Sequence, residues 1–303
     1  FQAEDGIRDF CLSRGLGDVY KRQTLSDSSK IDKLFKRFNI TEVIHLAASI
    51  QPSESIKNKK KYIKNNVFNT QKLLKICVKY KVGCFIFASS YSVYGSSTQK
   101  FKENSKKLPL SVYAKTKLMS EQDIIKILKK YKIKYGILRM SNIIGSDIKN
   151  KLGEVYNHDH IFKNYSKMYI EKKYLYNVYG TKHKTADGTA IRDYLHVNTA
   201  SKMILKTMQY IQQQQKNIIL NCGSGMGVSC LQIAETFFNL NKKKSIINKK
   251  EIRSGDPAIA ITSNLKAKKL LKIKLSPLSL KKIAKQYICL LYTSDAADEG
   301  LGV

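Results

Sequence analysis

Residues 84–140 read CFIFASSYSVYGSSTQKFKENSKKLPLSVYAKTKLMSEQDIIKILKKYKIKYGILRM, and this stretch decides the fold. Its first five residues, 84–88, form an apolar run that predicts a buried strand ending at Ser89-Ser90. Residues 113–131 predict a helix, and residues 135–140 predict a second buried strand. A strand, a helix and another strand in this order predict a doubly wound, parallel α/β sheet.

The same alternation continues on both sides of this stretch. Residues 32–38 and 62–80 predict helices, and residues 43–47 predict a short buried strand. Residues 143–189 have a looser pattern and read as loop-rich. Beyond them, strands are predicted at 191–197, 218–221 and near 246, and helices at 198–211, at 229–240 and from 278. Chemistry in such sheets lies at the carboxyl ends of strands, where Ala47-Ala48, Ser89-Ser90 and Ser141-Asn142 fall.

The chain is strongly basic, with a formal charge of +32 and 55 Lys and Arg residues. Only seven of these are Arg, and the lysines are dispersed over predicted helices and loops. Abundant Lys, Asn and Ile together are typical of AT-rich codons, so we interpret the charge as a solvated lysine-rich surface. A lysine-rich nucleic-acid-binding protein is the alternative, and it predicts a clustered basic face with steep salt dependence.

Membrane insertion and secretion are not indicated. The chain has no run of 18 apolar residues, and its first 30 residues lack the apolar core of a signal peptide. Its six cysteines show no CxxC spacing. We therefore expect reduced thiols in a cytoplasmic protein.

The two ends of the chain differ in charge from the middle. Residues 1–23 carry four acidic and four basic residues, and residues 289–303 carry three acidic ones. Residues 18–23 can be encoded by a sequence whose reverse complement, shifted by one base, encodes residues 289–294. Such inverted pairs are typical of adapters in transposon-based sequencing libraries. We therefore expect residues 1–23 and 289–303 to be translated adapter, and we exclude them from the fold prediction.

The candidate chemistry lies in the YAKTK motif at residues 113–117. Tyr113 and Lys117 are four residues apart on the predicted helix, so they share one face. An ammonium nearby lowers the pKa of a tyrosine from its usual value of about 10, which lets Tyr113 take a proton from a substrate hydroxyl. Ser90 ends the preceding strand and can share the same substrate oxygen. A YxxxK motif alone is weak evidence in a chain with 18 Tyr, and the ordered strand, Ser-Ser and helix strengthen it.

Further motifs carry a resemblance to a known family. They are VIHLAA (43–48), ES (54–55), YIKNNVFNT (62–70), SSYSVYG (89–95), YAKTKLMSE (113–121), LRMSNIIG (138–145), DGTAIRDYLHV (187–197), NCGSG (221–225) and RSGD (253–256). On these residues the chain resembles the extended short-chain dehydrogenase/reductase family. The DGTAIRDYLHV block is the most specific and favours the UDP-glucose 4-epimerase branch.

The resemblance implies a Rossmann-type parallel sheet with a smaller α/β substrate domain. Residues 24–142 would form a partial NAD-binding domain, and residues 143–288 a UDP-sugar-binding region with segments returning to the first domain. The implied catalytic residues are Ser90, Tyr113 and Lys117. The implied NAD contacts are Leu46, Ala47, Ala48, Asn66 and Ser141 together with the three catalytic residues. The implied substrate contacts are Asn142, Tyr179, Arg192, Arg253 and Asp256.

The implied reaction is inversion at C4 of a UDP-hexose, which interconverts UDP-glucose and UDP-galactose. Tyr113 would remove the 4-hydroxyl proton while C4 passes a hydride to NAD, and the 4-keto sugar would then be reduced on its other face. UDP-glucuronate and UDP-N-acetylhexosamine stay open as alternative substrates. Dehydration is disfavoured, because residues 90–95 lack the Asp and Glu that dehydratases of the family carry there. The resemblance also implies a homodimer through the helices at 62–80 and 113–131.

Three departures from the family pattern stand out. The glycine-rich turn and the acidic residue of the first strand–helix–strand unit are absent, so we expect the polypeptide as written to bind NAD poorly and to be inactive. Ile50 stands where the epimerase often has Lys, and Ser141 stands where an aromatic residue is usual. A degenerate fragment without function is therefore a further interpretation.

Arginine is scarce between residues 24 and 288, where only Arg37, Arg139, Arg192 and Arg253 occur. Retained Arg in a lysine-rich chain suggests a need for the planar guanidinium fork. We expect Arg192 and Arg253 to bind a pyrophosphate through it. Arg139 is expected in a structural ion pair, and Arg37 is expected to be exposed.

Several residues that suggest chemistry are interpreted as structural. Gly223, Gly225 and Gly227 resemble a phosphate loop, but we predict a structural turn. His158-Asp159-His160 is predicted to be a surface loop, and no metal site is predicted. We expect His45 to be a hydrogen-bonded histidine at a strand end, and Cys77 and Cys84 to lie in the core.

Overall fold

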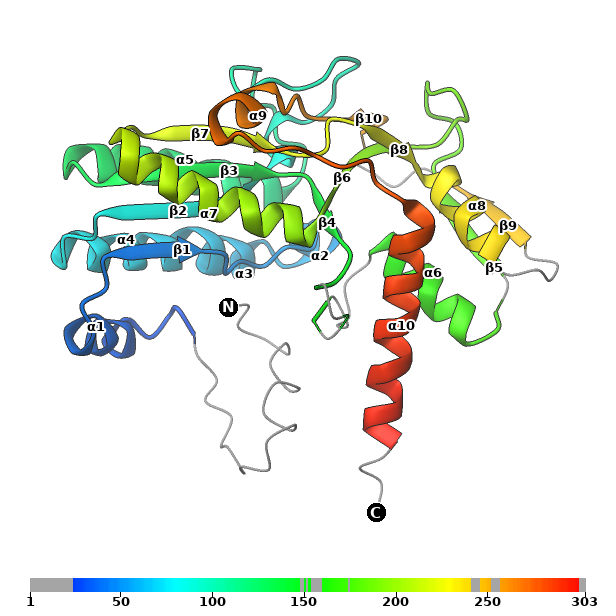
Figure 1. Cartoon of the computed structure of the whole chain (residues 1–303), viewed down its shortest axis with the longest axis horizontal. Helices are drawn as coiled ribbons and strands as arrows, with labels where there is room; N and C mark the ends of the chain where they lie inside the picture. Colours follow the sequence, from blue (N-terminus) through cyan, green and yellow to red (C-terminus); the bar gives the residue numbers. More distant parts are fainter. Residues whose placement is uncertain are drawn as a thin grey trace. The chain divides into compact units, whose positions relative to one another are not determined.

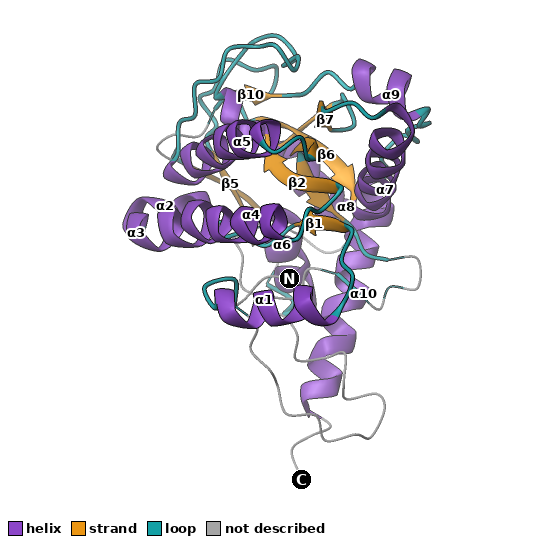
Figure 2. Cartoon of the chain, turned by 90° about the vertical axis from the view of Figure 1, so that its left-hand side faces the viewer, coloured by secondary structure: helices purple, strands orange, loops and turns teal. Residues whose placement is uncertain are grey.

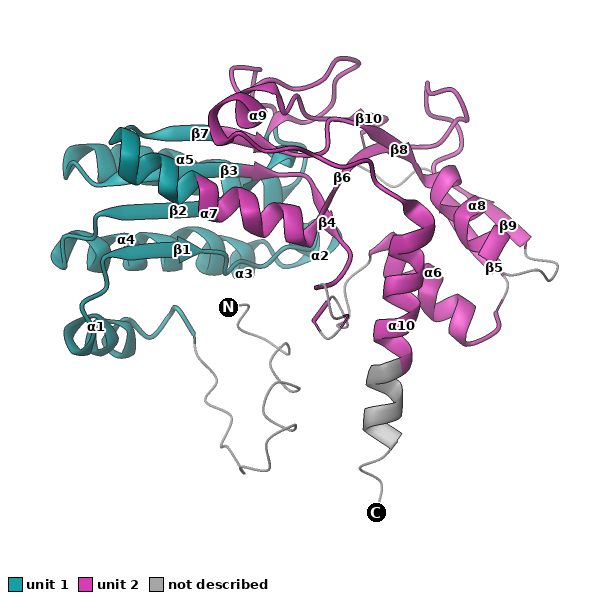
Figure 3. Cartoon of the chain, in the orientation of Figure 1, with its two compact units in different colours: residues 1–93, 109–138, 207–219 teal, residues 94–108, 139–206, 220–303 magenta. Residues whose placement is uncertain are grey.

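The structure is a computed structural model of the chain (Figure 1). It describes residues 24–147, 150, 152–153, 160–173, 175–240, 246–251 and 257–299. The helices within these ranges include none that is long and apolar enough to cross a membrane. The chain divides into two compact units, and Figure 3 colours them separately. Unit 1 comprises residues 1–93, 109–138 and 207–219, and unit 2 comprises residues 94–108, 139–206 and 220–303.

Unit 1 is built on a four-stranded sheet with the strand order β1-β2-β3-β7. Its strands are β1 (Glu42–His45), β2 (Cys84–Ser90), β3 (Lys134–Met140) and β7 (Ile218–Cys222), of which β3 and β7 end in unit 2. β1 pairs with β2 in parallel, so that both strands direct their carboxyl ends to the same edge of the sheet. The predicted doubly wound α/β class is confirmed.

Helices cover both faces of this sheet (Figure 2). One face carries α4 (Asn69–Lys79) and α5 (Val112–Lys130), and α1 (Ser28–Arg37) packs on α4. On the other face, residues 207–214 of α7 (Val197–Gln214) approach Gly136, where an added Cβ would lie 2.9 Å from Thr207. The absence of a side chain at Gly136 therefore lets helix and strand pack closely.

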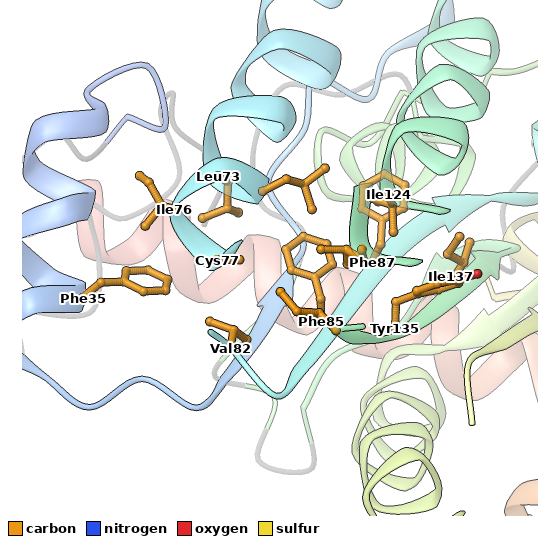
Figure 4. Close-up of a cluster of buried hydrophobic side chains, with 13 residues drawn as sticks. Phe35, Leu73, Ile76, Cys77, Val82, Phe85, Phe87, Ile124, Tyr135 and Ile137 are labelled. Carbon is orange, nitrogen blue, oxygen red and sulfur yellow. The ribbon is translucent and has the colours of Figure 1, made fainter. Parts of the chain in front are cut away.

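The core of unit 1 lies between the sheet and the helices α4 and α5 (Figure 4). Phe85 and Phe87 are two residues apart on β2, so their side chains point to the same face of the sheet. They pack with buried residues of both helices, which include Leu73, Leu74, Cys77, Ile124 and Leu128. The thiols of Cys77 and Cys84 are buried, and burial raises the pKa of each to about 12. The prediction that both belong to the core is confirmed.

The predicted helix at 62–80 contains an irregular turn. It consists of α3 (Lys59–Tyr62), the π-helix η2 (Ile63–Phe68) and α4. A π-helix closes its hydrogen bonds over five residues instead of four, and such turns are frequent at functional sites. Asn66 lies within η2 and is buried. A shorter helix, α2 (Pro52–Lys57), precedes this segment.

Unit 2 holds two smaller sheets. One has the order β10-β6-β4, with β8 also pairing with β6, and the other pairs β5 with β9. The strands are β4 (Asn142–Ile144), β5 (Leu175–Tyr179), β6 (Ile191–His196), β8 (Gly227–Ser229), β9 (Ile246–Lys250) and β10 (Ile259–Ala260). The helices wholly within unit 2 are α6 (Ile161–Ile170), α8 (Cys230–Leu240), α9 (Leu265–Leu271) and α10 (Leu280–Glu299). An aromatic core that includes Phe162, Tyr176 and Phe237 joins α6, β5 and α8.

Residues 143–189 include long loops, as predicted, and they also contain α6 and β5, which the sequence analysis did not identify. β5 pairs in parallel with β9, and Leu175 lies opposite Ile246. Because its partner strand lies about 70 residues later in the sequence, β5 has little local sequence pattern that would predict a strand. The expected domain boundary at residue 142 separates residues that would bind NAD from residues that would bind the UDP-sugar, and it does not follow from how the chain packs. This boundary stays a prediction.

Candidate active site

The candidate site in unit 1 begins at the carboxyl end of β2. Ser90 is the last residue of this strand, and its side chain is 7% exposed. Its oxygen accepts hydrogen bonds from the Ser92 backbone N–H (3.2 Å) and from the Ser92 hydroxyl (2.9 Å). Ser90 also forms a side-chain hydrogen bond with Tyr113. Two of the predicted catalytic residues are thus brought together, although 23 residues separate them in the sequence.

The first turn of α5 is held by two serine side chains. Ser111 is the N-cap, and its hydroxyl oxygen accepts from the Ala114 N–H at 3.1 Å. The hydroxyl oxygen of Ser55, from α2, accepts from the Tyr113 N–H at 3.1 Å. Backbone N–H groups in the first turn of a helix have no partner within the helix, so these bonds stabilise the turn. They fix the backbone from which the Tyr113 side chain extends.

Lys117 is buried, with 3% of the residue exposed. Its ammonium donates to the carbonyl oxygen of Ala88 at 2.8 Å and lies 4.8 Å from the centre of the Phe87 ring. Burial lowers the pKa of Lys117 to about 7, and the charge of Glu121 acts in the opposite direction. Lys117 therefore changes its charge near neutral pH.

The protonation of Tyr113 differs from the sequence-based expectation. Burial raises the pKa of the phenol above its ordinary value, and the hydrogen bond with Ser90 opposes this rise. The expected lowering by Lys117 does not prevail. Lys117 is not among the groups that shift the pKa of Tyr113, and burial drives each member of the YxxxK pair towards its neutral form.

Asn66 organises the segment that follows β1. Its side-chain oxygen accepts from the Ser49 N–H at 2.8 Å, and its amide nitrogen donates to the Ser49 carbonyl and to the Thr116 hydroxyl, both at 3.0 Å. The segment that Asn66 holds follows directly on Leu46, Ala47 and Ala48. Leu46 is 46% exposed. Asn66 thereby links this loop to α5, and its predicted contact with a cofactor stays a prediction.

His45 ends β1 and is a buried structural residue, as expected. Its Nε2 atom lies 2.8 Å from the Thr70 hydroxyl, and its ring contacts Phe85 and Phe87. Burial, together with the charge of Lys117, lowers the pKa of His45 to about 3. The imidazole is therefore neutral throughout the physiological range.

In unit 2, two predicted substrate residues lie on neighbouring strands. Asn142 begins β4 and pairs with Tyr194 of β6, two positions after Arg192. Paired residues of parallel strands, and residues two apart on one strand, point to the same face. Asn142 and Arg192 therefore share a face of this sheet. The Arg192 guanidinium donates to the carbonyl oxygens of Ile191 (2.9 Å) and Ala258 (3.4 Å).

Asp193 points to the opposite face and is fully buried. Its carboxylate accepts from the backbone and hydroxyl of Ser224, from the Gly225 N–H, and from the backbone and hydroxyl of Thr262. An added Cβ at Gly223 would lie 2.2 Å from the Asp193 and Thr262 oxygens, and Gly225 has a positive φ of +75°. These glycines form a turn around an internal carboxylate, and the predicted structural turn is confirmed.

Arg139 is a buried residue with hydrogen-bonding partners, whereas the ion pair expected for it stays a prediction. It is 1% exposed, and its guanidinium donates to the Tyr94 hydroxyl (2.7 Å) and to the Glu103 carbonyl (3.0 Å). Tyr94 in turn donates to Asn221 at 2.7 Å, so one network joins the three segments of unit 2. Arg37 is exposed, as predicted.

The structure describes some of the remaining predicted site residues and leaves others outside its described ranges. Tyr179 ends β5 and is partly exposed, and Ser141 is buried with its backbone N–H donating to Cys222 at 2.9 Å. Arg253 and Asp256 lie outside the described residues, as do His158 and Asp159. No group of three His, Cys, Asp or Glu side chains suited to a metal ion occurs in the described ranges.

Two residues of the motifs quoted in the sequence analysis support the site, although sequence reasoning assigned no role to either of them. Ser55 holds the backbone of Tyr113, and Glu121 is a buried carboxylate that accepts from the Ser89 hydroxyl. Glu121 could have been found from its spacing, because it stands four residues after Lys117 on the same helix. Ser55 has no comparable local signal, since 58 residues separate it from Tyr113.

Comparison with known proteins gives consistent results. The model of the NAD dependent epimerase/dehydratase family matches residues 16–223. The UDP-glucose 4-epimerase of Streptococcus mutans is 30% identical over 250 residues, which cover 82% of this chain and 75% of that protein. A crystal structure of UDP-glucose 4-epimerase from Brucella ovis in complex with NAD has a TM-score of 0.82 and 28% identity, and covers 89% of this chain and 84% of its own. The UDP-Glc/GlcNAc 4-epimerase from Campylobacter jejuni has a TM-score of 0.77 and 28% identity, with coverage of 95% and 87%.

Proposed function

The chain belongs to the NAD dependent epimerase/dehydratase family, and on that premise we propose that it inverts C4 of a UDP-hexose, interconverting UDP-glucose and UDP-galactose. The observation that carries the proposal is the meeting of Ser90, Tyr113 and Lys117 at the carboxyl end of β2. Relatives named UDP-glucose 4-epimerase, at 27% and 30% identity, support the same reaction class.

The loop after β1 suits part of a NAD site, whereas the poor NAD binding expected from the missing glycine-rich turn stays a prediction. The loop after β1 lies at the carboxyl end of a parallel strand, where α/β sheets bind nucleotides, and it offers the exposed apolar Leu46 beside the small Ala47 and Ala48. Asn66 holds this loop through Ser49. NAD supplies the acceptor for the hydride that leaves C4 and returns it to the 4-keto sugar.

Tyr113 is the proposed acid and base. The phenolate of Tyr113 would receive the proton of the 4-hydroxyl, becoming a phenol, and return it after inversion, and Ser90 would hold the same sugar oxygen through a hydrogen bond. Burial raises the pKa of Tyr113. We therefore expect proton transfer to depend on a nearby positive charge that stabilises the phenolate, and Lys117 is the proposed source of it. The Lys117 ammonium donates a hydrogen bond to the Ala88 carbonyl oxygen, which holds it near the carboxyl end of β2.

The proposed contacts to the UDP moiety come from unit 2. Arg192 and Asn142 share a sheet face, and a guanidinium binds a pyrophosphate in a bidentate manner that Lys does not reproduce. Tyr179, Arg253 and Asp256 complete the proposed set. An N-acetylated sugar is a second candidate substrate, because the Campylobacter jejuni enzyme acts on UDP-Glc and UDP-GlcNAc by its name and matches 95% of this chain.

The test is conversion of UDP-galactose deuterated at C4, with NAD added, followed by proton and deuterium NMR. We expect UDP-glucose with the deuterium still at C4 and no net reduction of NAD, because the same hydride returns to the same carbon. UDP-N-acetylgalactosamine and UDP-glucuronate serve as competing substrates. Absence of C4 inversion with every substrate would refute the proposal.

A further inference from the structure

Glu121 is a buried carboxylate beside the proposed catalytic residues. It lies on α5 and is 1% exposed. Tyr113, Lys117 and Glu121 follow one another at intervals of four residues, so they form one row on the helix. A carboxylate is costly to bury, and its burial calls for a charge or hydrogen bonds that stabilise it.

The hydroxyl of Ser89 provides such a hydrogen bond to Glu121. Ser89 is the neighbour of Ser90 on β2, and Ala88 of the same strand accepts from the Lys117 ammonium. Two consecutive turns of α5 are therefore joined to two consecutive residues of β2. These contacts fix the helix that carries Tyr113 against the strand that carries Ser90.

We propose that Glu121 is a positioning residue that keeps Lys117 in its charged form and holds α5 in register with β2. It acts on the substrate only through Lys117. The consequence for catalysis rests on the proposed function, whereas the effect on Lys117 itself does not.

The other groups around Lys117 cannot take over this role. His45 of β1 is neutral, because burial lowers its pKa to about 3, and Tyr113 is a neutral phenol. β2 presents a carbonyl oxygen and the Phe87 ring, which favour a cation only weakly. Burial lowers the pKa of Lys117 to about 7, and among the described neighbours Glu121 is the charge that raises it. Without Glu121 the ammonium would lose its proton below neutral pH.

The direct test is the pKa of Lys117 in Glu121→Gln. The lysine side chains are labelled with ¹³C, their Cε signals are followed against pH by NMR, and the Lys117 signal is assigned by its absence in Lys117→Met. We expect the pKa of Lys117 to fall by about one to two units, as removal of an adjacent opposite charge requires. Glutamine retains the shape of the side chain and an acceptor for Ser89.

Two further variants separate charge from shape. Ser89→Ala removes the hydrogen bond and leaves the carboxylate, so the pKa of Lys117 should move far less than in Glu121→Gln. Glu121→Asp keeps the negative charge, so the pKa of Lys117 should stay close to its value in the unsubstituted protein. This variant tests the role of the charge if Glu121→Gln does not fold. An unchanged Lys117 pKa in Glu121→Gln, or an equal shift in Ser89→Ala, would overturn the inference.

The catalytic consequence is read from the pH profile of turnover. In Glu121→Gln the alkaline limb of kcat should move to lower pH by the same shift as the Lys117 pKa, with a loss of about tenfold at pH 8 for a shift of one unit. If the unsubstituted protein shows no C4 inversion but the NMR shift is found, the proposed function fails and the role of Glu121 towards Lys117 stands.

Discussion

Acidification should destabilise the fold through His45, and the variant His45→Gln isolates this effect. The imidazole is buried at the end of β1, and its Nε2 atom lies 2.8 Å from the Thr70 hydroxyl. Burial lowers the pKa of His45 from 6.5 to about 3. The unfolded chain therefore binds a proton between these values while the folded chain does not, so stability is present above pH 6.5 and is lost as the pH falls towards 3.

The size of the loss follows from the two pKa values. Each pH unit between them costs about 1.4 kcal/mol, so lowering the pH from 7 to 5 removes about 2 kcal/mol of the free energy of unfolding. Protonation over the whole range would remove about 5 kcal/mol. A net stability of about 5–15 kcal/mol is typical of whole proteins, so this single imidazole is a large contributor to acid unfolding.

Urea unfolding at pH 7 and pH 5, followed by circular dichroism, measures the loss. We expect the difference between the two pH values to be about 2 kcal/mol smaller in His45→Gln than in the unsubstituted chain. Glutamine can still bond to Thr70 but does not titrate. The control Thr70→Val removes the hydrogen bond and keeps the imidazole, so it should lower stability at both pH values and retain the pH-dependent difference. Equal differences in His45→Gln and the unsubstituted chain would refute the reasoning.

Three further predictions concern the proposed function and the fold. Tyr113→Phe should lower kcat by about 10²- to 10⁴-fold in NMR assays of C4 inversion, whereas Tyr131→Phe, an exposed phenol at the end of the same helix, should leave it unchanged. Arg192→Lys should weaken UDP binding by about ten- to a hundredfold in calorimetry, whereas the exposed Arg37→Lys should not; similar affinities would contradict the pyrophosphate contact. Gly223→Ala would place a methyl group 2.2 Å from two buried oxygens and should lower the free energy of unfolding by about 1–3 kcal/mol in urea titrations, and an unchanged midpoint would count against the turn geometry.

The regular elements around the proposed active site could be predicted because their signals are local. The strand at 84–90 follows from a run of apolar residues, and the helix at 112–130 follows Ser111, whose side chain caps it. The YxxxK spacing alone places Tyr113 and Lys117 on one face of the helix. Local patterns and tertiary packing agree here, so sequence reasoning was sufficient.

Features that depend on distant contacts could not be predicted in this way. β5 is five residues long and pairs with a strand about 70 residues away, so no local periodicity reveals it. The support of Tyr113 by Ser55 crosses 58 residues. The balance of charge also escaped prediction, because the pKa values of Tyr113 and Lys117 are set mainly by burial, which the YxxxK spacing does not encode.

The π-helix η2 has a consequence for how this protein tolerates insertions and deletions. A turn with one extra residue rotates everything after it by about 100° relative to a continuous α-helix. Asn66 can therefore form a hydrogen bond with Ser49, while Leu73 and Cys77 of the following helix α4 face the hydrophobic core. Removing one residue between Ile63 and Phe68 would restore a regular helix, and only one of these two orientations would survive. The length of this turn is thus under a stricter constraint than the identity of most residues within it.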